Sequence, residues 1–205
     1  MNRRVSKCNV GIVDYGIAGN TKNVFQAILA ADGEAHFIKS PKDFQKVDKI
    51  ILPGVGGFKG VMDNLNDADL VAPLRLALRS KPTLAICVGM QILASIGFEH
   101  GVTDGLQVIE GEVRNMQVDA VLPHIGFSKI CSIGSNRLLK GLDEQEFYFM
   151  HSFELINYLN VSALAVYHDH QFVAAVESDS IFGVQFHPEK SRDPGIQVFK
   201  NFVRL

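Results

Sequence analysis

Short apolar runs alternate with helix-like segments through the first half of the chain. The segment at 20–33 carries Val24, Phe25, Ile28 and Leu29 at helical spacing, and residues 60–80 supply further helix. The apolar runs around these segments end in turn residues and read CNVGIVDYG (8–16), EAHFIKS (34–40), DKIILPGVGGF (48–58) and PTLAICVG (82–89). Strands that alternate with helices predict βαβ units and a parallel sheet that is buried on both faces.

The second half changes to strand-like segments separated by short turns, and an amphipathic helix at 194–205 closes the chain. These segments read GLQVIEGEVRNMQ (105–117), AVLPHIGFSKIC (120–131), EFYFMHSFEL (146–155) and SALAVYHDHQFVAAVESDSIFGVQFHP (162–188). We expect them to form a partly antiparallel extension of the same sheet. Because the sequence shows no serine- or proline-rich linker and no repeat, we expect one domain over residues 1–205.

Composition narrows the class of protein. The 205 residues are 47% hydrophobic and 20% charged, and their net charge is -2, so nothing predicts a basic surface for nucleic acid or a membrane. The apolar runs are too short to span a bilayer, and residues 1–16 lack the apolar stretch of a signal peptide. Cys8, Cys87 and Cys131 are odd in number and far apart, which argues against a disulfide framework and favours a reducing cytoplasm.

A metal site is not expected from this sequence. His168 and His170 lie two residues apart, but no third ligand follows nearby, so a solvated strand end is the better interpretation. The cysteines are too scattered for a zinc site, and Cys8 and Cys131 are interpreted as structural. No cofactor is expected either.

Cys87 is the first candidate for chemistry, because it lies on the corner between a buried strand and a helix. In open α/β sheets the chemistry lies outside the carboxyl ends of the strands. A nucleophile on such a corner is exposed, and the N-terminus of the following helix stabilises a thiolate and offers N–H groups to an oxyanion. The small residues Ala85 and Gly89 permit the tight turn. A buried structural cysteine is the alternative, and it is the commoner fate of a cysteine in an apolar run.

Two more segments are expected at the same edge of the sheet. His187 and Glu189 follow the apolar strand IFGVQF, and a histidine can take the thiol proton while a carboxylate orients its ring. Residues two apart share a face of a strand, although Pro188 is expected to bend the chain there. The glycine-rich loop at 53–57 can present a peptide N–H to an oxyanion. Taken separately, the His187–Glu189 segment is best interpreted as a solvated turn and the glycine-rich loop as a tight βα turn. Together with Cys87, the two segments favour a nucleophilic cysteine site.

With these motifs, the sequence resembles the class I (triad-type) glutamine amidotransferases over nearly its whole length. Within that family it is most similar to the glutaminase subunits of imidazole glycerol phosphate synthases. The resemblance implies a flavodoxin-like three-layer α/β fold, with a mostly parallel central sheet, helices on both faces and an antiparallel extension in the C-terminal half. The matching motifs are DYG…GN, PGVGGF, CVGMQIL, GLQVIEG, PHIGF, FYFMHSF and FGVQFHPEKS.

The resemblance also assigns roles residue by residue. It implies a catalytic triad of Cys87 as nucleophile, His187 as general base and acid, and Glu189 as the group that orients the histidine. It implies an oxyanion hole from the backbone N–H groups of Val55 and Val88. The residues implied to bind glutamine are Gly54, Gln91, Glu99, His151, Ser152 and Phe153, and those implied to face a partner subunit are Asn20, Phe127 and Lys190.

The implied activity is hydrolysis of glutamine to glutamate, with the ammonia passed to a partner. That partner would be a (β/α)8-barrel synthase subunit in a heterodimer that serves histidine biosynthesis. Four features depart from the family pattern: Ala85 replaces a glycine, one extra residue lies between Tyr15 and Asn20, and Phe127 and Ser128 replace a tryptophan and an asparagine.

Three other functions stay open at this point. A paralogous glutaminase subunit that supplies ammonia for a surface-polysaccharide sugar would carry the same catalytic residues. A non-catalytic scaffold subunit would need a broken triad, whereas Cys87, His187 and Glu189 are all present. A cysteine peptidase or deglycase with the same corner typically has histidine directly after the cysteine, where this chain has Val88.

Overall fold

A computed structural model describes residues 7–17, 21–156 and 159–205 of the chain, and the central feature of the described part is a nine-stranded sheet. Its strand order is β2-β1-β3-β4-β13-β12-β11-β8-β9. The five strands from β2 to β13 pair in parallel, whereas the strands from β13 to β9 pair in antiparallel fashion. The expected parallel sheet with an antiparallel extension is therefore confirmed.

The parallel half matches the alternation seen in the sequence. Its strands are β1 (Asn9–Val13), β2 (Glu34–Ile38), β3 (Lys49–Leu52), β4 (Thr83–Ile86) and β13 (Ile181–Val184). The helices between and after them are α1 (Thr21–Ala30), η1 (Pro41–Lys46), α2 (Phe58–Asp67), α3 (Val71–Leu78), α4 (Val88–Gln91), η2 (Pro188–Lys190) and α5 (Arg192–Arg204). The predicted helix at 60–80 is thus two helices, which residues 68–70 separate.

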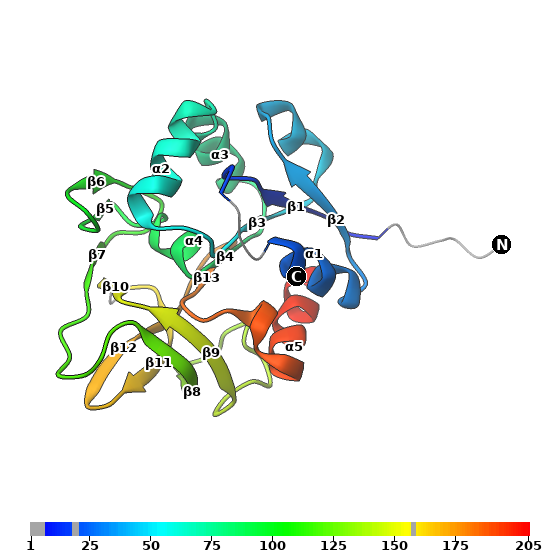
Figure 1. Ribbon diagram of the computed structural model, residues 1–205. Helices are drawn as coiled ribbons and strands as arrows, with labels where there is room; N and C mark the ends of the chain where they lie inside the picture. The colour runs from blue at the N-terminus through cyan, green and yellow to red at the C-terminus, as the bar shows by residue number, and fades with distance from the viewer. Residues whose placement is uncertain (1–6, 18–20, 157–158) are drawn as a thin grey trace.

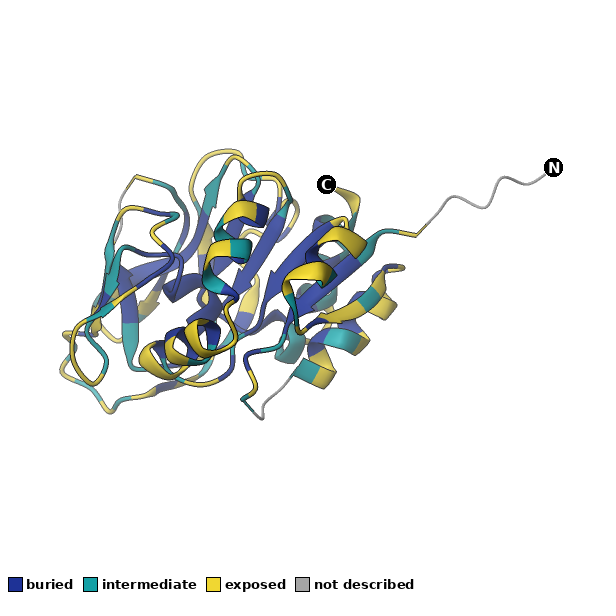
Figure 2. Ribbon diagram, turned by 90° about the horizontal axis from the view of Figure 1, so that it is seen from above, coloured by how far each residue is buried: buried dark blue, intermediate teal, exposed yellow. Residues whose placement is uncertain are grey.

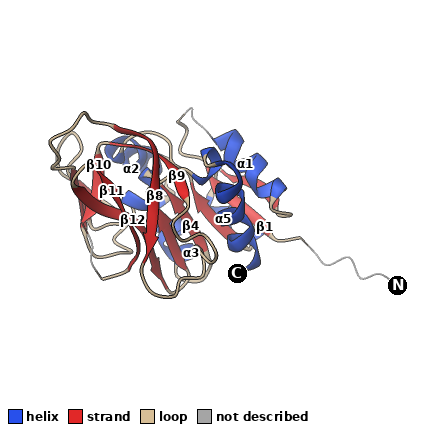
Figure 3. Cartoon of the chain, turned by 90° about the horizontal axis from the view of Figure 1, so that it is seen from below, coloured by secondary structure: helices blue, strands red, loops and turns tan. Residues whose placement is uncertain are grey.

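Helices cover both faces of the parallel strands. Figures 1 and 3 show α1 and α5 together on one face, with α2 and α3 on the other. The strand residues alternate accordingly: Ile50 and Leu52 pack on the α2 side, whereas Ile51 packs on the α1 side. Seen from above, the buried strands lie between helices whose outer faces are exposed (Figure 2). Within the described residues, none of the helices has the length and apolar character needed to cross a membrane.

The second half departs from the prediction in one respect. The large sheet takes β8 (His124–Ser132), β9 (Glu146–His151), β11 (Val161–Tyr167) and β12 (His170–Ser178). A separate four-stranded sheet is formed by β5 (Ile96–Gly97), β6 (Thr103–Asp104), β7 (Glu112–Asn115) and β10 (Phe153–Ile156). The expectation that all these segments join one sheet was therefore wrong. The chain bends at Ser152, whose carbonyl accepts from Met116 N–H, so β10 pairs with β7 instead of β8.

The carboxyl ends of β3, β4 and β13 lie side by side, because these three strands are neighbours in the sheet. The loop at 53–57, Cys87 and the segment at 185–187 follow directly from these ends. Two glycines permit the close approach. A Cβ on Gly89 would lie 2.3 Å from the Leu52 carbonyl oxygen, and one on Gly54 would lie 3.0 Å from the Ile86 carbonyl oxygen. The single edge predicted from the sequence is confirmed.

We predict that Gly89→Ala destabilises the fold, because the added methyl group meets backbone that cannot rotate away. The expected loss in the free energy of unfolding is about 1–3 kcal/mol, as for other overpacked sites. Gly60→Ala is the matched control: Gly60 lies in α2, and a Cβ there meets nothing within 4 Å. It should be neutral or stabilise by about 0.5–1 kcal/mol. Chemical denaturation of both variants gives the comparison, and equal stabilities would contradict the proposed close contact.

Candidate active site

Cys87 lies on a strained corner between β4 and α4. Its backbone has φ 50° and ψ -114°, a region that non-glycine residues seldom occupy and that costs on the order of 1–3 kcal/mol. The corner is held by a hydrogen bond of 2.7 Å from Cys87 N–H to the Val184 carbonyl on β13. The Cys87 side chain is almost completely buried, and α4 continues for one turn only. Cys8 is half-buried and Cys131 is exposed.

His187 and Glu189 form a buried pair beside this corner. Nδ1 of His187 lies 2.8 Å from Oε1 of Glu189, and both side chains are at most 2% exposed. The pair forms because Pro188 begins the short helix η2, which brings Glu189 back to the histidine, so the shared strand face expected from the spacing is not the cause. The backbone of His187 is anchored twice, through its N–H to the Tyr148 carbonyl and through its carbonyl to the Ser191 hydroxyl.

Gly54 places the cysteine and the histidine on opposite sides of one narrow gap. A Cβ on Gly54 would lie 2.9 Å from Cβ of Cys87 and also 2.9 Å from Cε1 of His187. The Nε2 atom of His187 is buried and has no hydrogen-bond partner of ordinary geometry within the described residues. Since Nδ1 is taken by Glu189, Nε2 is the atom left to exchange a proton with Cys87 or with a molecule bound between them.

The charges in this cluster favour an imidazolium at neutral pH. Burial by itself lowers the pKa of His187, but the Cys87 thiolate and the Glu189 carboxylate both raise it, and the resulting pKa is about 10. A buried histidine can hold its proton in this way only while negative charge lies close to it. The cluster can therefore stabilise a thiolate–imidazolium pair, which is the activated form of a cysteine nucleophile.

The two backbone N–H groups expected to form an oxyanion hole belong to the glycine-rich loop and to the start of α4. Val55 lies between Gly54 and Gly56, whose φ is 84°, and Val88 is the first residue of α4. Within the described residues no hydrogen bond uses the N–H of Val55 or of Val88. Donors that are fixed by the backbone and still unused can stabilise a developing negative charge next to Cys87.

The other predicted glutamine-binding residues on this side are joined by hydrogen bonds. Nε2 of Gln91 donates to the Phe153 carbonyl at 2.9 Å and to Oε1 of Gln185 at 3.0 Å. Nδ1 of His151 also lies 2.9 Å from the Phe153 carbonyl oxygen. Burial lowers the pKa of His151 to about 3, so its ring is neutral. Ser152, between these two residues, is half-buried.

Glu99 contacts the end of the glycine-rich loop rather than the Cys87 corner itself. Its Oε2 accepts a hydrogen bond of 2.6 Å from Phe58 N–H at the start of α2, and a Cβ on Gly57 would lie 2.8 Å from the same oxygen. A carboxylate at a helix N-terminus is well placed electrostatically. Glu99 therefore holds the end of the loop that begins at Gly54.

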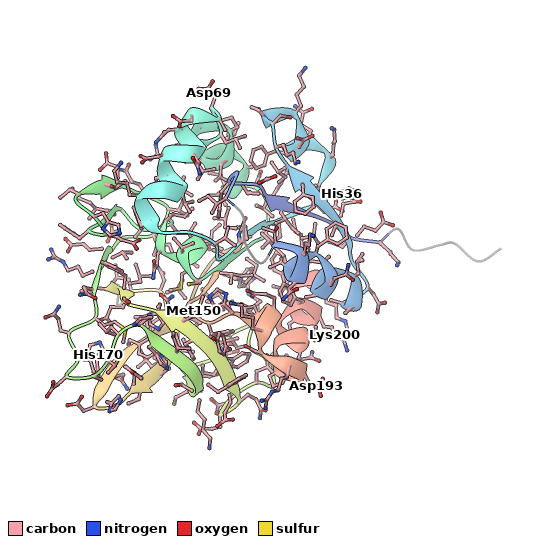
Figure 4. All side chains as sticks on the ribbon, viewed as in Figure 1. His36, Asp69, Met150, His170, Asp193 and Lys200 are labelled. Atoms are coloured by element: carbon pink, nitrogen blue, oxygen red, sulfur yellow. The ribbon has the colours of Figure 1, made fainter. Side chains whose placement is uncertain are left out.

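An exposed apolar surface borders Cys87. Ile125 and Phe127 on β8 are 58% and 40% exposed, and Met150 on β9, opposite Ile125, is 41% exposed. The Met150 carbonyl oxygen is 4.0 Å from Sγ of Cys87, and Figure 4 labels Met150 near the centre of the molecule as viewed. Two cations lie on aromatic rings at this surface: Lys190 Nζ is 5.4 Å from the Tyr148 ring, and Arg192 is 4.6 Å from the Phe127 ring. The predicted interface residue Asn20 lies outside the described residues.

Three residues at the site escaped the sequence reasoning. Gln185 is fully buried, and its Nε2 donates to Sγ of Cys87 at 3.5 Å. Ser191 is fully buried and links the backbone of His187 to that of Tyr148. Met150 contributes only its carbonyl to the Cys87 contact, which no sequence pattern reveals. The available signal for Gln185 was a polar residue inside an apolar strand, because such residues need a partner.

The two histidines considered as metal ligands have other surroundings. Nε2 of His170 lies 2.8 Å from Oε1 of Glu154. His168 is near enough to His124 to help lower the pKa of that ring, after the larger effect of burial. In the described ranges no group of three or more histidine, cysteine, aspartate or glutamate side chains could hold a metal ion.

Comparison with known proteins identifies the family. The family model for glutamine amidotransferase class-I matches residues 12–205. The chain belongs to the class-I glutamine amidotransferase family. Among solved structures, one described as a glutamine amidotransferase superimposes with a TM-score of 0.75 at 18% identity, covering 96% of this chain and 99% of the other. That likeness shows the same fold over nearly the whole chain.

Family members of known sequence are similar over almost their full length. Imidazole glycerol phosphate synthase subunit HisH 1 of Campylobacter jejuni is 41% identical over 96% of this chain and 100% of the relative. The subunit HisH of Leptospira interrogans is 39% identical over 96% and 100%. The subunit HisH of Aquifex aeolicus is 35% identical over 94% of this chain and 95% of the relative.

We predict that the pKa of His187 falls well below 10 in the Cys87→Ser variant. Burial lowers this pKa, and Cys87 is the main group that raises it, so replacing a thiolate by a neutral hydroxyl removes most of the upward effect. An NMR titration of the His187 ring measures the change, with Cys131→Ser as the control because Cys131 is exposed. An unchanged titration in Cys87→Ser would mean that Glu189 alone holds the proton.

Proposed function

We propose that this chain is the glutaminase subunit of an imidazole glycerol phosphate synthase. It hydrolyses glutamine to glutamate and passes the ammonia to a partner synthase subunit in histidine biosynthesis. The observation that carries the proposal is the 41% identity to a HisH subunit over 96% of this chain and 100% of the relative. The Cys87, His187 and Glu189 cluster supplies the chemistry that a glutaminase needs. We infer one amidotransferase domain that works in the cytoplasm and needs no cofactor.

In the first half of the proposed reaction, Cys87 forms a bond to the side-chain amide carbon of glutamine. The thiolate attacks, and the carbonyl oxygen becomes an oxyanion that the N–H groups of Val55 and Val88 stabilise. The carbon–nitrogen bond then breaks as His187 Nε2 gives its proton to the leaving nitrogen. Ammonia departs, and a glutamyl thioester remains on Cys87.

The charge balance explains why His187 can release the proton at that moment. While Cys87 is a thiolate, its charge raises the pKa of His187. Once the sulfur is bound to carbon, that charge is gone and the effect of burial lowers the histidine pKa. Neutral His187 then takes a proton from water, the water oxygen attacks the thioester, and glutamate leaves as the thiol–histidine pair is restored. Glu189 keeps Nδ1 protonated throughout, so that Nε2 faces the reaction.

The glutamine substrate is proposed to lie between the glycine-rich loop and the start of β10. Gly54 keeps the reacting end open, since any side chain there would fill the gap between Cys87 and His187. Gln91 has both N–H groups occupied, so its Oε1 is the atom available to accept from the substrate's ammonium group. The remaining members of the proposed binding set are Glu99, His151, Ser152 and Phe153.

The exposed surface of Ile125, Phe127 and Met150 is proposed to bind the partner, a (β/α)8-barrel subunit. Aromatic and arginine side chains at the centre of an interface contribute much of its binding energy, and Phe127 with Arg192 provides both. Lys190 follows the catalytic Glu189 directly, so a contact that moves Lys190 acts on the triad. Asn20 is proposed to add to this surface. Because Met150 of this surface lies next to Cys87, a partner bound there would receive ammonia directly.

We predict that Cys87→Ser keeps the fold and abolishes glutamine hydrolysis, because a hydroxyl is not ionised beside His187. A glutamine-like electrophile should label Cys87 in the wild-type chain and leave Cys8 and Cys131 unlabelled. Peptide mapping locates the label, and Cys131→Ser should hydrolyse glutamine at the wild-type rate. A label on Cys8 or Cys131, or activity in Cys87→Ser, would refute Cys87 as nucleophile.

We predict that this chain restores growth without histidine to a strain that lacks its own glutaminase subunit, when it is supplied with its barrel partner. Supplied alone, it is expected to rescue poorly, because Phe127 and Ser128 change the contact surface for a foreign barrel. Cys87→Ser with the same partner is the control. If the pair hydrolyses glutamine in vitro but never rescues growth, the chain serves another acceptor, such as a surface-polysaccharide sugar.

A further inference from the structure

Gln185 is a fully buried polar side chain that contacts the sulfur of Cys87 and has no place in the mechanism above. It follows β13, two residues before His187. Its Nε2 lies 3.5 Å from Sγ of Cys87, and its Oε1 accepts from Gln91. Gln91 in turn donates to the Phe153 carbonyl. A continuous chain of hydrogen bonds therefore runs from a backbone carbonyl to the nucleophile.

The Phe153 carbonyl determines which way the side-chain amides of Gln91 and Gln185 are oriented. A backbone carbonyl can only accept, so Gln91 must present its NH2 group to Phe153. His151 supplies a second donor to the same carbonyl, which leaves no freedom to reverse the arrangement. The second N–H of Gln91 donates to Oε1 of Gln185. With its oxygen committed to Gln91, Gln185 must turn its NH2 group toward Cys87.

We propose that Gln185 is a positioning residue that stabilises the reactive thiolate of Cys87 by a hydrogen bond whose direction Gln91 and the Phe153 carbonyl enforce. A neutral thiol is a weak acceptor, whereas a thiolate accepts a charge-assisted hydrogen bond, so this donor favours the ionised form. The inference rests on the proposed glutaminase function, since it assigns a role within that reaction.

The same geometry links substrate binding to the nucleophile. Gln91 is proposed to accept from the substrate with Oε1, and it holds Gln185 with Nε2. A substrate that draws Gln91 toward itself therefore changes the hydrogen bond that Gln185 can offer to Cys87. A residue that only fills space at this position would leave the ionisation of Cys87 unaffected, so the two roles make different predictions.

The test is the pH dependence of Cys87 alkylation by iodoacetamide, a small neutral probe, in the full-length chain. Gln185→Met removes the donor and keeps the size of the side chain. It should move the half-maximal pH for alkylation upward by about one unit and slow alkylation at neutral pH about tenfold. Gln91→Met, which frees the Gln185 amide to rotate, should give a smaller upward shift. Gln171→Met is the matched control, because Gln171 is exposed on β12 and should alkylate as the wild type does.

Gln185→Glu is a second variant for the same alkylation measurement if Gln185→Met does not fold. It keeps an oxygen for Gln91 but brings a carboxylate to the sulfur, so ionised Glu should suppress alkylation more than Met does. Wild-type alkylation profiles in both folded Gln185 variants would overturn the proposal. Glutamine hydrolysis by the wild-type chain with its partner is measured in parallel. Its absence would count against the proposed function, whereas its presence with unchanged alkylation profiles counts against Gln185 alone.

Discussion

The close approach of three strand ends is the constraint on which the site depends. The end of β3 can reach the Cys87 corner only because Gly54 and Gly89 carry no side chain. That approach places the glycine-rich loop, the nucleophile and the segment carrying His187 around one gap. The strain at Cys87, with φ 50°, is held by the bond to Val184 and by the packing of Gly89 on Leu52. Sheet packing thus offsets the cost of the strained backbone at Cys87.

Within that geometry, the negative charges of Cys87 and Glu189 set the protonation state of His187. A buried histidine would ordinarily be neutral, yet His187 stays protonated because Cys87 and Glu189 surround it with negative charge. In the proposed reaction this arrangement changes, since acylation of Cys87 removes the main charge that holds the proton. Gln185 contributes a dipole whose NH2 end points at the sulfur. In that reaction, proton release is tied to formation of the sulfur–carbon bond.

Many features of the fold and of the site could be predicted from the sequence. The features that could not be predicted depend on contacts between distant parts of the chain. The alternation of apolar runs predicted the parallel strands, and the glycines at 54, 56, 57 and 89 indicated the tight turns at the sheet edge. The spacing of apolar residues could not show that β10 leaves the large sheet, because the bend at Ser152 depends on its hydrogen bond with Met116. The pairing of His187 with Glu189 was expected, but its cause is the turn that Pro188 begins. Gln185 was missed because its role depends on Gln91, which lies 94 residues away in the chain.

The central claim is that Cys87 carries the glutamyl group during turnover. The direct measurement is acid quenching of the chain with its partner within the first turnovers on glutamine, followed by mass spectrometry of its peptides. The account predicts a mass increase of one glutamyl group on the Cys87 peptide, absent from Cys87→Ser and lost when glutamine is exhausted. Sustained glutamate production with an unmodified Cys87 peptide at every quench time, or an adduct on another residue, would contradict it.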